Sequence, residues 1–238
     1  MKRLLLFSSI VTLFSSDAAA QKISNPFLSG RKTTSLGAMA SIPVGQFSGT
    51  DLQDGGYAQT GWGLYFDSKT TLKSGLSFIS HSTYSWVPLN HAALANTFTT
   101  ELGRKTEISG GKHMPFLTTL GIGYDIAATK FLKFGISAQG GLMYNSFKGF
   151  DINVYDANNT LLFTDNLKFD SQFSFAYVLG ANASVSLIKD LVDVQVNVDY
   201  SASKFSSILR SHNIDPIKTS QQIQLVNVGL GIVIYTNK

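Results

Sequence analysis

The residues of this chain best suited to proton transfer are four histidines: His81, His91, His113 and His212. His81 is followed by Ser82, and His113 is expected across from His81 at one rim of the fold. Catalysis by this set needs a nucleophile, a base and an orienting acid within hydrogen-bond reach. No acidic residue can be placed beside these histidines, and no metal-ligand spacing or nucleotide fingerprint is visible. We therefore expect no enzyme, no metal and no cofactor, with a lipid-A-modifying enzyme using His81 or His113 as a less favoured alternative.

A sparse set of charged residues stands opposite the apolar positions of alternating segments. These residues are Asp67, Lys73, Asp125, Lys133, Asp193 and Asp199. If this face points into the fold, the charges must pair, because an unpaired buried charge is very costly. Lys73 and Lys133 are therefore predicted to pair with Asp67, Asp125 or Asp193, as a polar plug inside the fold. A gate or a narrow ion path is the functional alternative to simple filling.

The composition narrows the class of protein. The chain has 238 residues, of which 44% are apolar and only 14% charged. An ordinary soluble domain has about 25% charged residues. The formal charge of +4 comes without a cluster of lysine and arginine, so no nucleic-acid partner is expected. The absence of cysteine excludes disulfides, cysteine metal sites and thiol catalysis.

The first twenty residues look like an export signal. Lys2 and Arg3 precede an apolar stretch at 4–14, and three alanines at 18–20 form a small-residue cleavage site. The apolar stretch is shorter than the roughly 20 residues that a membrane-spanning helix needs. We predict a cleaved signal peptide at 1–20 and a single domain at 21–238, with an uncleaved N-terminal anchor as the alternative.

Two-residue alternation of apolar and polar side chains dominates the rest of the chain. Residues 192–200, VDVQVNVDY, are the plainest case, and this period is that of a strand with two different faces. Many segments reach ten residues, and a strand crosses a bilayer with about 9–11. A change of phase near Leu225 predicts a bulge. The expected strands lie near 34–44, 57–67, 72–86, 113–126, 131–147, 171–187, 192–204 and 221–235.

The connections between these segments alternate in length. Short ones are expected at 68–71, 127–130 and 188–191, and long ones at 45–56, 87–112, 148–170 and 205–220. Short turns at one end and long loops at the other are typical of outer-membrane barrels. Periodicity alone leaves open which face is inside. A soluble lipocalin-like barrel would keep the apolar face inside, around a ligand.

Aromatic residues on the apolar faces fall into two groups once the strands alternate in direction. Two aromatic belts are typical of the two membrane interfaces. The group expected near the long loops is Tyr84, Trp86, Tyr144, Phe173, Tyr177 and Tyr200, and the group near the short turns is Phe66, Tyr124 and Phe134.

Two of the long loops carry structure of their own. In 87–112, Asn90 and Gly103 are plausible caps of a short helix with Leu94, Phe98 and Leu102 on one stripe. In 148–170, two β-prone runs flank an Asp/Asn turn at 156–159, which predicts a hairpin. Both loops could contact protein partners or pack only on themselves. Basic loop residues such as Lys204 and Lys218 could meet lipid phosphates or remain solvated.

Three segments resemble the small eight-stranded outer-membrane barrels of the OmpA-barrel, OmpX and OmpW type, and in particular the barrel domains common in Bacteroidota. They are GYAQTGWG at 56–63, LGIGYD at 120–125 and VNVGLGIVIY at 226–235. The resemblance implies a Gram-negative outer membrane and contact with lipopolysaccharide. It also implies that the barrel-assembly machinery recognises the last strand, here ending at Tyr235 and followed by three more residues.

Together these observations predict an all-β fold, an eight-stranded antiparallel up-and-down transmembrane β-barrel. The expected role is structural or interactive, with long extracellular loops that engage partners or with service as an accessory subunit of an outer-membrane complex. A narrow porin-like channel for small solutes is the alternative.

Overall fold

The computed structural model describes residues 30–51, 55–211 and 217–236. Arg31–Lys238 is a compact unit. The expected signal peptide at 1–20 lies outside the described residues.

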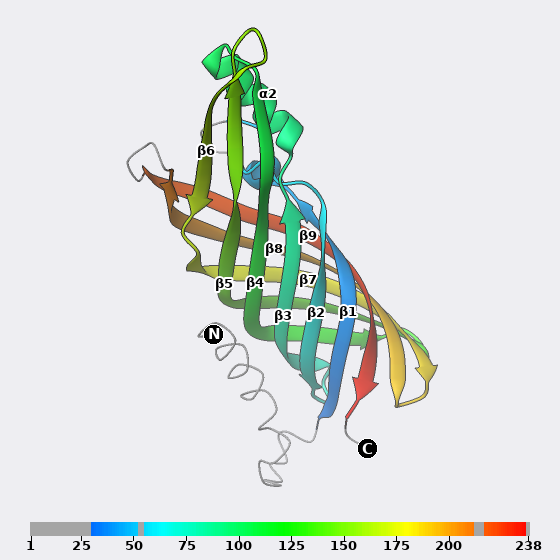
Figure 1. Ribbon diagram of the computed structural model, residues 1–238. Coiled ribbons are helices and arrows are strands. Elements are labelled where there is room, and N and C mark those ends of the chain that lie inside the picture. Colours follow the sequence, from blue (N-terminus) through cyan, green and yellow to red (C-terminus); the bar gives the residue numbers. More distant parts are fainter. Residues whose placement is uncertain (1–29, 52–54, 212–216, 237–238) are drawn as a thin grey trace, which may run out of the picture. The chain divides into compact units, whose positions relative to one another are not determined.

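The described residues of this unit form nine strands, one α-helix and one 3-10 turn (Figure 1). The ribbon shows long, tilted strands, with α2 and β6 at one end of the strand assembly. The elements are β1 (Arg31–Pro43), the 3-10 turn η3 (Gly45–Ser48), β2 (Gly61–Thr71), β3 (Leu76–Pro88), α2 (His91–Leu102), β4 (Thr106–Ala127), β5 (Leu132–Tyr155), β6 (Leu161–Phe169), β7 (Gln172–Ile188), β8 (Val192–Arg210) and β9 (Ile217–Tyr235).

Eight of these strands close into a ring. Each of β1, β2, β3, β4, β5, β7, β8 and β9 pairs antiparallel with the next, and β9 returns to β1 with Leu230 opposite Ala38. Closure removes the sheet edges, as crossing a bilayer with strands requires. The predicted eight-stranded antiparallel barrel is confirmed. The ninth strand, β6, lies outside the ring and pairs with the extension of β5 and the last residues of β8.

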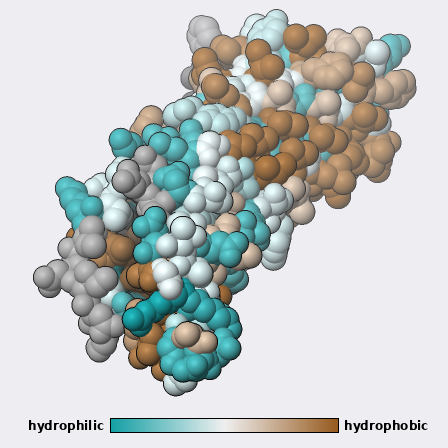
Figure 2. Space-filling view, turned by 90° about the horizontal axis from the view of Figure 1, so that it is seen from above, coloured by the Kyte–Doolittle hydropathy of each residue, from teal (hydrophilic) through white to brown (hydrophobic). Residues whose placement is uncertain are grey.

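The apolar face of the strands points outward. Leu120 and Ile136 expose 71% and 64% of their surface, whereas Ser77 and Thr119 on the opposite face are buried. Figure 2 shows hydrophobic residues gathered over one large part of the visible surface, whereas the rest is mainly hydrophilic or intermediate. This orientation is the reverse of a lipocalin-like barrel. Among the described residues, no helix has the length and apolar character needed to cross a membrane.

Three tight connections lie at one end of the barrel, called here the turn end. They occupy residues 72–75, 128–131 and 189–191. At the opposite end, called the lobe end, β4 and β5 continue far beyond the ring. The extension of β5 forms a hairpin with β6, and α2 packs beside β4. Much of what the sequence suggested as long loops is therefore regular structure.

The predicted bulge near Leu225 is wrong. β9 keeps one register against β8 from Ile217 to Ile234, with Leu225 opposite Ser201. Ile223, Leu225 and Asn227 all point inward and are buried. The change of phase arises because the filling of the barrel turns from polar to apolar toward the lobe end, while the strand stays regular.

Candidate functional site: the barrel interior and the lobe

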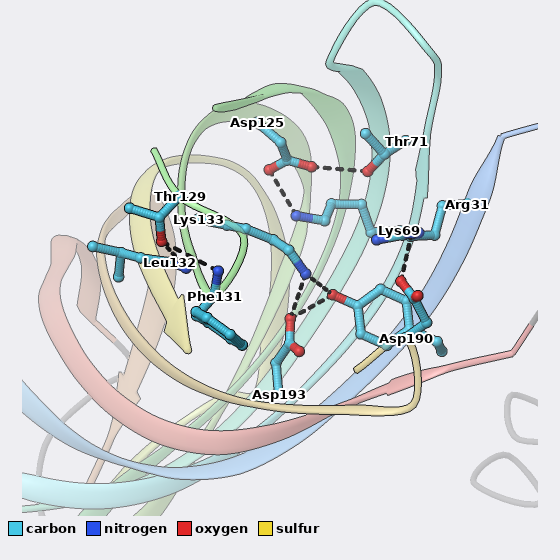
Figure 3. A network of polar contacts seen from close by, with 11 residues as sticks. Arg31, Lys69, Thr71, Asp125, Thr129, Phe131, Leu132, Lys133, Asp190 and Asp193 are labelled. Carbon is cyan, nitrogen blue, oxygen red and sulfur yellow. Dashed lines mark hydrogen bonds and ion pairs between the residues drawn. The ribbon is translucent and has the colours of Figure 1, made fainter. Parts of the chain in front are cut away.

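Two ion pairs form the floor of the barrel interior at the turn end (Figure 3). Lys133 Nζ lies 2.8 Å from Asp193 Oδ2, and the Tyr235 hydroxyl contacts both groups. Lys69 Nζ lies 2.8 Å from Asp125 Oδ1, and the Thr71 hydroxyl donates to Asp125 Oδ2 at 2.8 Å. Four strands thus contribute charges that neutralise each other within the barrel mouth.

The structure places Lys73 differently from the sequence prediction. Lys73 lies in the exposed turn between β2 and β3, outside the barrel interior. Its expected place is taken by Lys69, four residues earlier. The turn is at 72–75, with Gly75 at φ 90°, whereas the sequence had suggested a turn at 68–71. The longer β2 carries Lys69 inward and leaves Lys73 in solvent.

A polar layer lies above this floor. Asp67 Oδ1 is 2.5 Å from His81 Nδ1, and Ser35 Oγ donates to Asp67 Oδ2 at 3.3 Å. Asp199 accepts a hydrogen bond from Asn227 Nδ2 at 2.8 Å. Asp67, His81 and Asp199 line a small cavity of about 40 Å³. Such a volume holds only a few waters, since one water occupies about 10–15 Å³ on this measure.

Tyr65 fills much of this layer, and glycines of the neighbouring strands β1 and β9 make room for its ring. A Cβ added at Gly37 would clash with the Tyr65 ring, and one at Gly229 would lie 2.9 Å from it. A Cβ at Gly231 would crowd the Tyr65 hydroxyl and would lie 2.5 Å from the Leu36 carbonyl oxygen. These inward glycines thus leave the space that the Tyr65 side chain occupies. The sequence analysis did not identify Tyr65 as part of the interior.

An apolar plug closes the interior toward the lobe end. Phe47, carried inward by η3, is fully buried there and packs edge-on against His113 with ring centroids 5.0 Å apart. Gly56 passes directly beside Phe47, where a Cβ would meet the Phe47 backbone. The plug consists of Phe47, Ala58, Val87, Leu117, Met143, Ala176, Val178, Phe205, Ile223 and Leu225. The ion pairs at the turn end, the polar layer and the apolar plug together fill the barrel interior.

The described histidines do not assemble into a nucleophilic site, and His212 lies outside the described residues. Ser35 contacts the Asp67 carboxylate rather than His81, and Ser82 points outward to Thr118 Oγ1 at 3.2 Å. His113 packs against Phe47 of the apolar plug and against Phe147. Asp67 is nevertheless an acid beside His81, which sequence reasoning failed to place. The described residues hold no group of three or more acidic, histidine or cysteine side chains arranged for a metal ion.

The aromatic residues predicted as belts lie on the outer face. Near the lobe end, Tyr84 contacts Trp86 at 4.4 Å and Tyr144 contacts Phe173 at 4.8 Å between ring centroids. Tyr177 and Tyr200 are 6.1 Å apart. Trp62, which the sequence analysis did not assign to a belt, stacks on Trp86 at 4.2 Å. Toward the turn end, Phe66, Tyr124 and Phe134 are exposed, and so are Phe78 and Phe131, which the sequence analysis did not assign to a belt.

Outside the ring, α2 and the extended strands form a lobe with its own core. The Asn90 side chain accepts from the Ala93 amide at 3.0 Å, and Gly103 adopts φ 62° at the other end of α2. The helix and both of its caps are as predicted. Leu94 is buried and Phe98 packs against the same core, while Leu102 remains exposed. The buried core residues are Tyr57, Leu89, Leu94, Phe147, Phe150, Ile152, Val154 and Leu167.

The predicted hairpin at 148–170 is also present. β5 and β6 pair from Phe150 opposite Leu167 to Tyr155 opposite Leu161. Asp156 caps the turn by accepting from the backbone amides of residues 158 and 160 at 2.8 Å each. On the exposed face, hydrogen bonds from Lys105 and Tyr155 hold the pKa of Glu107 below its usual range. This lobe is therefore folded, and its outer surface carries polar side chains as well as exposed apolar ones.

A closed antiparallel barrel with an apolar wall, aromatic residues near both ends and a polar filling is the architecture of outer-membrane β-barrels. The fold and its site place the chain in this structural class.

Comparisons with known proteins give likeness of fold at low sequence identity. Neisserial surface protein A is 13% identical, with a TM-score of 0.43, over 87% of this chain and 97% of that chain. Ail of Yersinia pestis is 10% identical, with a TM-score of 0.43 over the same shares. OprG of Pseudomonas aeruginosa is 10% identical, with a TM-score of 0.49, over 88% and 97%. No protein-family model matches the sequence. No curated protein matches it either.

Proposed function

We propose that this protein resides in the outer membrane of a Gram-negative cell and holds the lobe at the cell surface, where the lobe binds another surface protein. The observation that carries this proposal is the lobe itself. Its core of eight buried apolar residues is separate from the barrel plug, and strands continuous with the barrel wall carry it. A mobile loop would need neither a core of its own nor support from strands of the barrel wall.

The tip of β6 is the part of the lobe best suited to contact a partner. Leu161, Leu162 and Phe163 expose 51%, 44% and 47% of their surface. β6 pairs with β5 along one edge, whereas its pairing with β8 involves only Lys168 and Phe169. An exposed strand edge with apolar side chains is a site where another chain can add a strand.

The experiment is gentle extraction of the protein from membranes through an affinity tag inserted after Asn158, followed by native sizing and identification of companions. We expect a stable assembly larger than one barrel, with a companion in stoichiometric amount. A lone barrel would contradict the proposed role, and absence from the membrane fraction would contradict the location as well.

A variant with serine at Leu161, Leu162 and Phe163 sharpens the test. It should insert and fold normally but lose the companion, because these side chains lie outside both cores. The matched control is Leu102→Ser, which removes an exposed apolar side chain from α2 instead. Equal retention of the companion by the triple variant and the control would remove the β6 tip from the proposal.

A narrow channel is the second candidate, and the charges that line the interior favour it. Asp67, His81 and Asp199 surround the cavity, and the two lysine pairs lie below it. The apolar plug opposes it, because an ion would have to pass buried side chains such as Leu117 and Met143. We therefore expect planar bilayers with the reconstituted protein to stay silent. Conductance that changes in Lys133→Met or Asp125→Asn would instead support the channel.

We propose no catalytic role for His81 or His113. His81 is held by Asp67 inside the barrel, and His113 lies among phenylalanine rings. Lipid A composition should therefore be unchanged in cells that carry His81→Ala or His113→Ala. An altered lipid profile in either strain would revive the enzyme alternative.

A further inference from the structure

Near the lobe end, the backbone pairing between β7 and β8 stops before either strand ends. Backbone pairing between these strands begins at Ala176 opposite Ser203, whereas farther up β8 pairs with β6, as Phe169 opposite Leu209. Between these points two hydroxyls bridge the strands. Ser203 Oγ donates to the Phe175 carbonyl oxygen at 2.8 Å, and Ser174 Oγ donates to the Lys204 carbonyl oxygen.

A groove of about 390 Å³ lies on the outer side of this seam. Phe175 and Tyr177 of β7 form one side, Lys204 of β8 lies across from them, and Gln222 and Gln224 of β9 complete it. Gln224 is held in place because its amide donates to the Tyr200 hydroxyl at 3.1 Å. The groove is therefore built from ordered strands rather than from a loop.

The groove lies at the boundary between apolar and polar side chains on the outer face of the barrel. Phe175 and Tyr177 expose 67% and 44% of their surface, and Leu179 continues the apolar face toward the turn end. In the other direction β7 continues with the exposed Phe173, whereas the outward residues of β8 and β9 are mainly polar or basic. Lys204 pairs with Gln222 across β8 and β9, and Lys218 lies farther along the same face, opposite Ile208. Neither Asp nor Glu is among the residues that line the groove.

We propose that this groove binds one phosphorylated glycolipid of the outer leaflet, of the lipid A class. The inference rests on the proposed location in the outer membrane. An acyl chain fits along Phe175 and Tyr177, which continue the lipid-facing wall. The phosphate lies at the Lys204 ammonium, which matches its charge. The Gln222 and Gln224 amides match sugar hydroxyls, because each amide both donates and accepts hydrogen bonds.

The test uses the full-length protein in phosphatidylcholine nanodiscs that contain a small fraction of either lipid A or phosphatidylglycerol. Lipid that remains bound to each barrel is counted by native mass spectrometry. We expect about one lipid A per wild-type barrel and about tenfold less in Lys204→Glu, since a basic residue at a membrane surface is worth roughly a factor of five to ten. The matched control is Lys148→Glu, an exposed lysine on the outward face of β5, which should bind like wild type.

A second variant, Phe175→Ser, tests the acyl contact and should also lower retention. Equal retention by wild type and Lys204→Glu would overturn the site. Phosphatidylglycerol retained as well as lipid A would overturn the glycolipid assignment. Each variant is first checked for insertion and folding, so loss of the site is distinguished from failure of the barrel. A protein that never enters the bilayer would contradict the proposed location, whereas an inserted barrel without bound lipid A would contradict only this inference.

Discussion

Asp67 and His81 face each other across the β2–β3 hairpin inside the barrel, with Oδ1 of Asp67 2.5 Å from Nδ1 of His81. Their side chains expose only 14% and 5% of their surface. The contact joins two residues that the register of the hairpin places directly opposite each other.

Loss of this contact should destabilise the barrel strongly. Asp67→Leu leaves His81 and Ser35 buried without their carboxylate, and breaking a buried pair costs about 3–5 kcal/mol. Urea unfolding of the protein in lipid vesicles measures this change. Arg31→Met is the control, since it breaks the exposed pair with Asp190 and should cost about 0–1 kcal/mol. Similar losses in the two variants would contradict the buried contact.

Lys69 and Lys73 should behave very differently. Lys69→Met removes the partner of Asp125 inside the barrel mouth and should cost about 1–3 kcal/mol. Lys73→Met changes only an exposed turn and should stay within about 0.5 kcal/mol of wild type. The same unfolding assay compares the two. A larger loss for Lys73→Met would mean that the turn lies at the position first suggested by the sequence.

The space around Tyr65 gives a third prediction. Gly231→Ala would place a methyl group against the Tyr65 hydroxyl and the backbone of β1, and overpacking costs about 1–3 kcal/mol. Gly140→Ala is the matched control, because its nearest neighbour is the outward Phe175 ring at 3.3 Å. Thermal unfolding in detergent should rank Gly231→Ala clearly below Gly140→Ala. Equal stability would show that Tyr65 does not occupy this space.

The base of the lobe should be sensitive to acid through Asp170 and Arg210. The guanidinium donates to both carboxylate oxygens, at 2.9 and 3.0 Å, and these hydrogen bonds hold the pKa of Asp170 below its usual range. A lowered folded-state pKa means that the contribution of this pair is present above the unfolded pKa and lost as the pH falls through the folded pKa. Carboxyl NMR titration should therefore show a higher midpoint for Asp170 in Arg210→Gln. An unchanged midpoint would contradict the pairing.

Much of the barrel could be predicted because a strand with different faces shows its period directly in the sequence. A slip by one residue would exchange the outer and inner faces, so the alternation around Leu120, Val198 and Leu230 determines the face of each strand. The helix between Asn90 and Gly103 and the turn at Asp156 could be predicted for a different reason. Their caps are local interactions within a few residues.

The interior could not be predicted as well, because its contacts join distant strands. The partners of Lys69 and His81 depend on the position of one turn. The sequence analysis placed this turn four residues too early, so it wrongly assigned Lys73 to the interior. Tyr65 was missed because its space is made by Gly37, Gly229 and Gly231, which lie far from it in the sequence. The apolar plug was not predicted because the inner face of the strands was assumed to be polar along its whole length.

Cysteine labelling in intact cells tests the central claim, that the barrel crosses the outer membrane with the lobe outside. The chain contains no cysteine, so single substitutions report one position each. Asn158→Cys in the lobe hairpin should react with a membrane-impermeant maleimide on intact cells. Lys73→Cys, in the turn at the opposite end, should react only after the outer membrane is permeabilised. Labelling of Lys73→Cys but not Asn158→Cys on intact cells, or of neither residue after permeabilisation, would contradict the account.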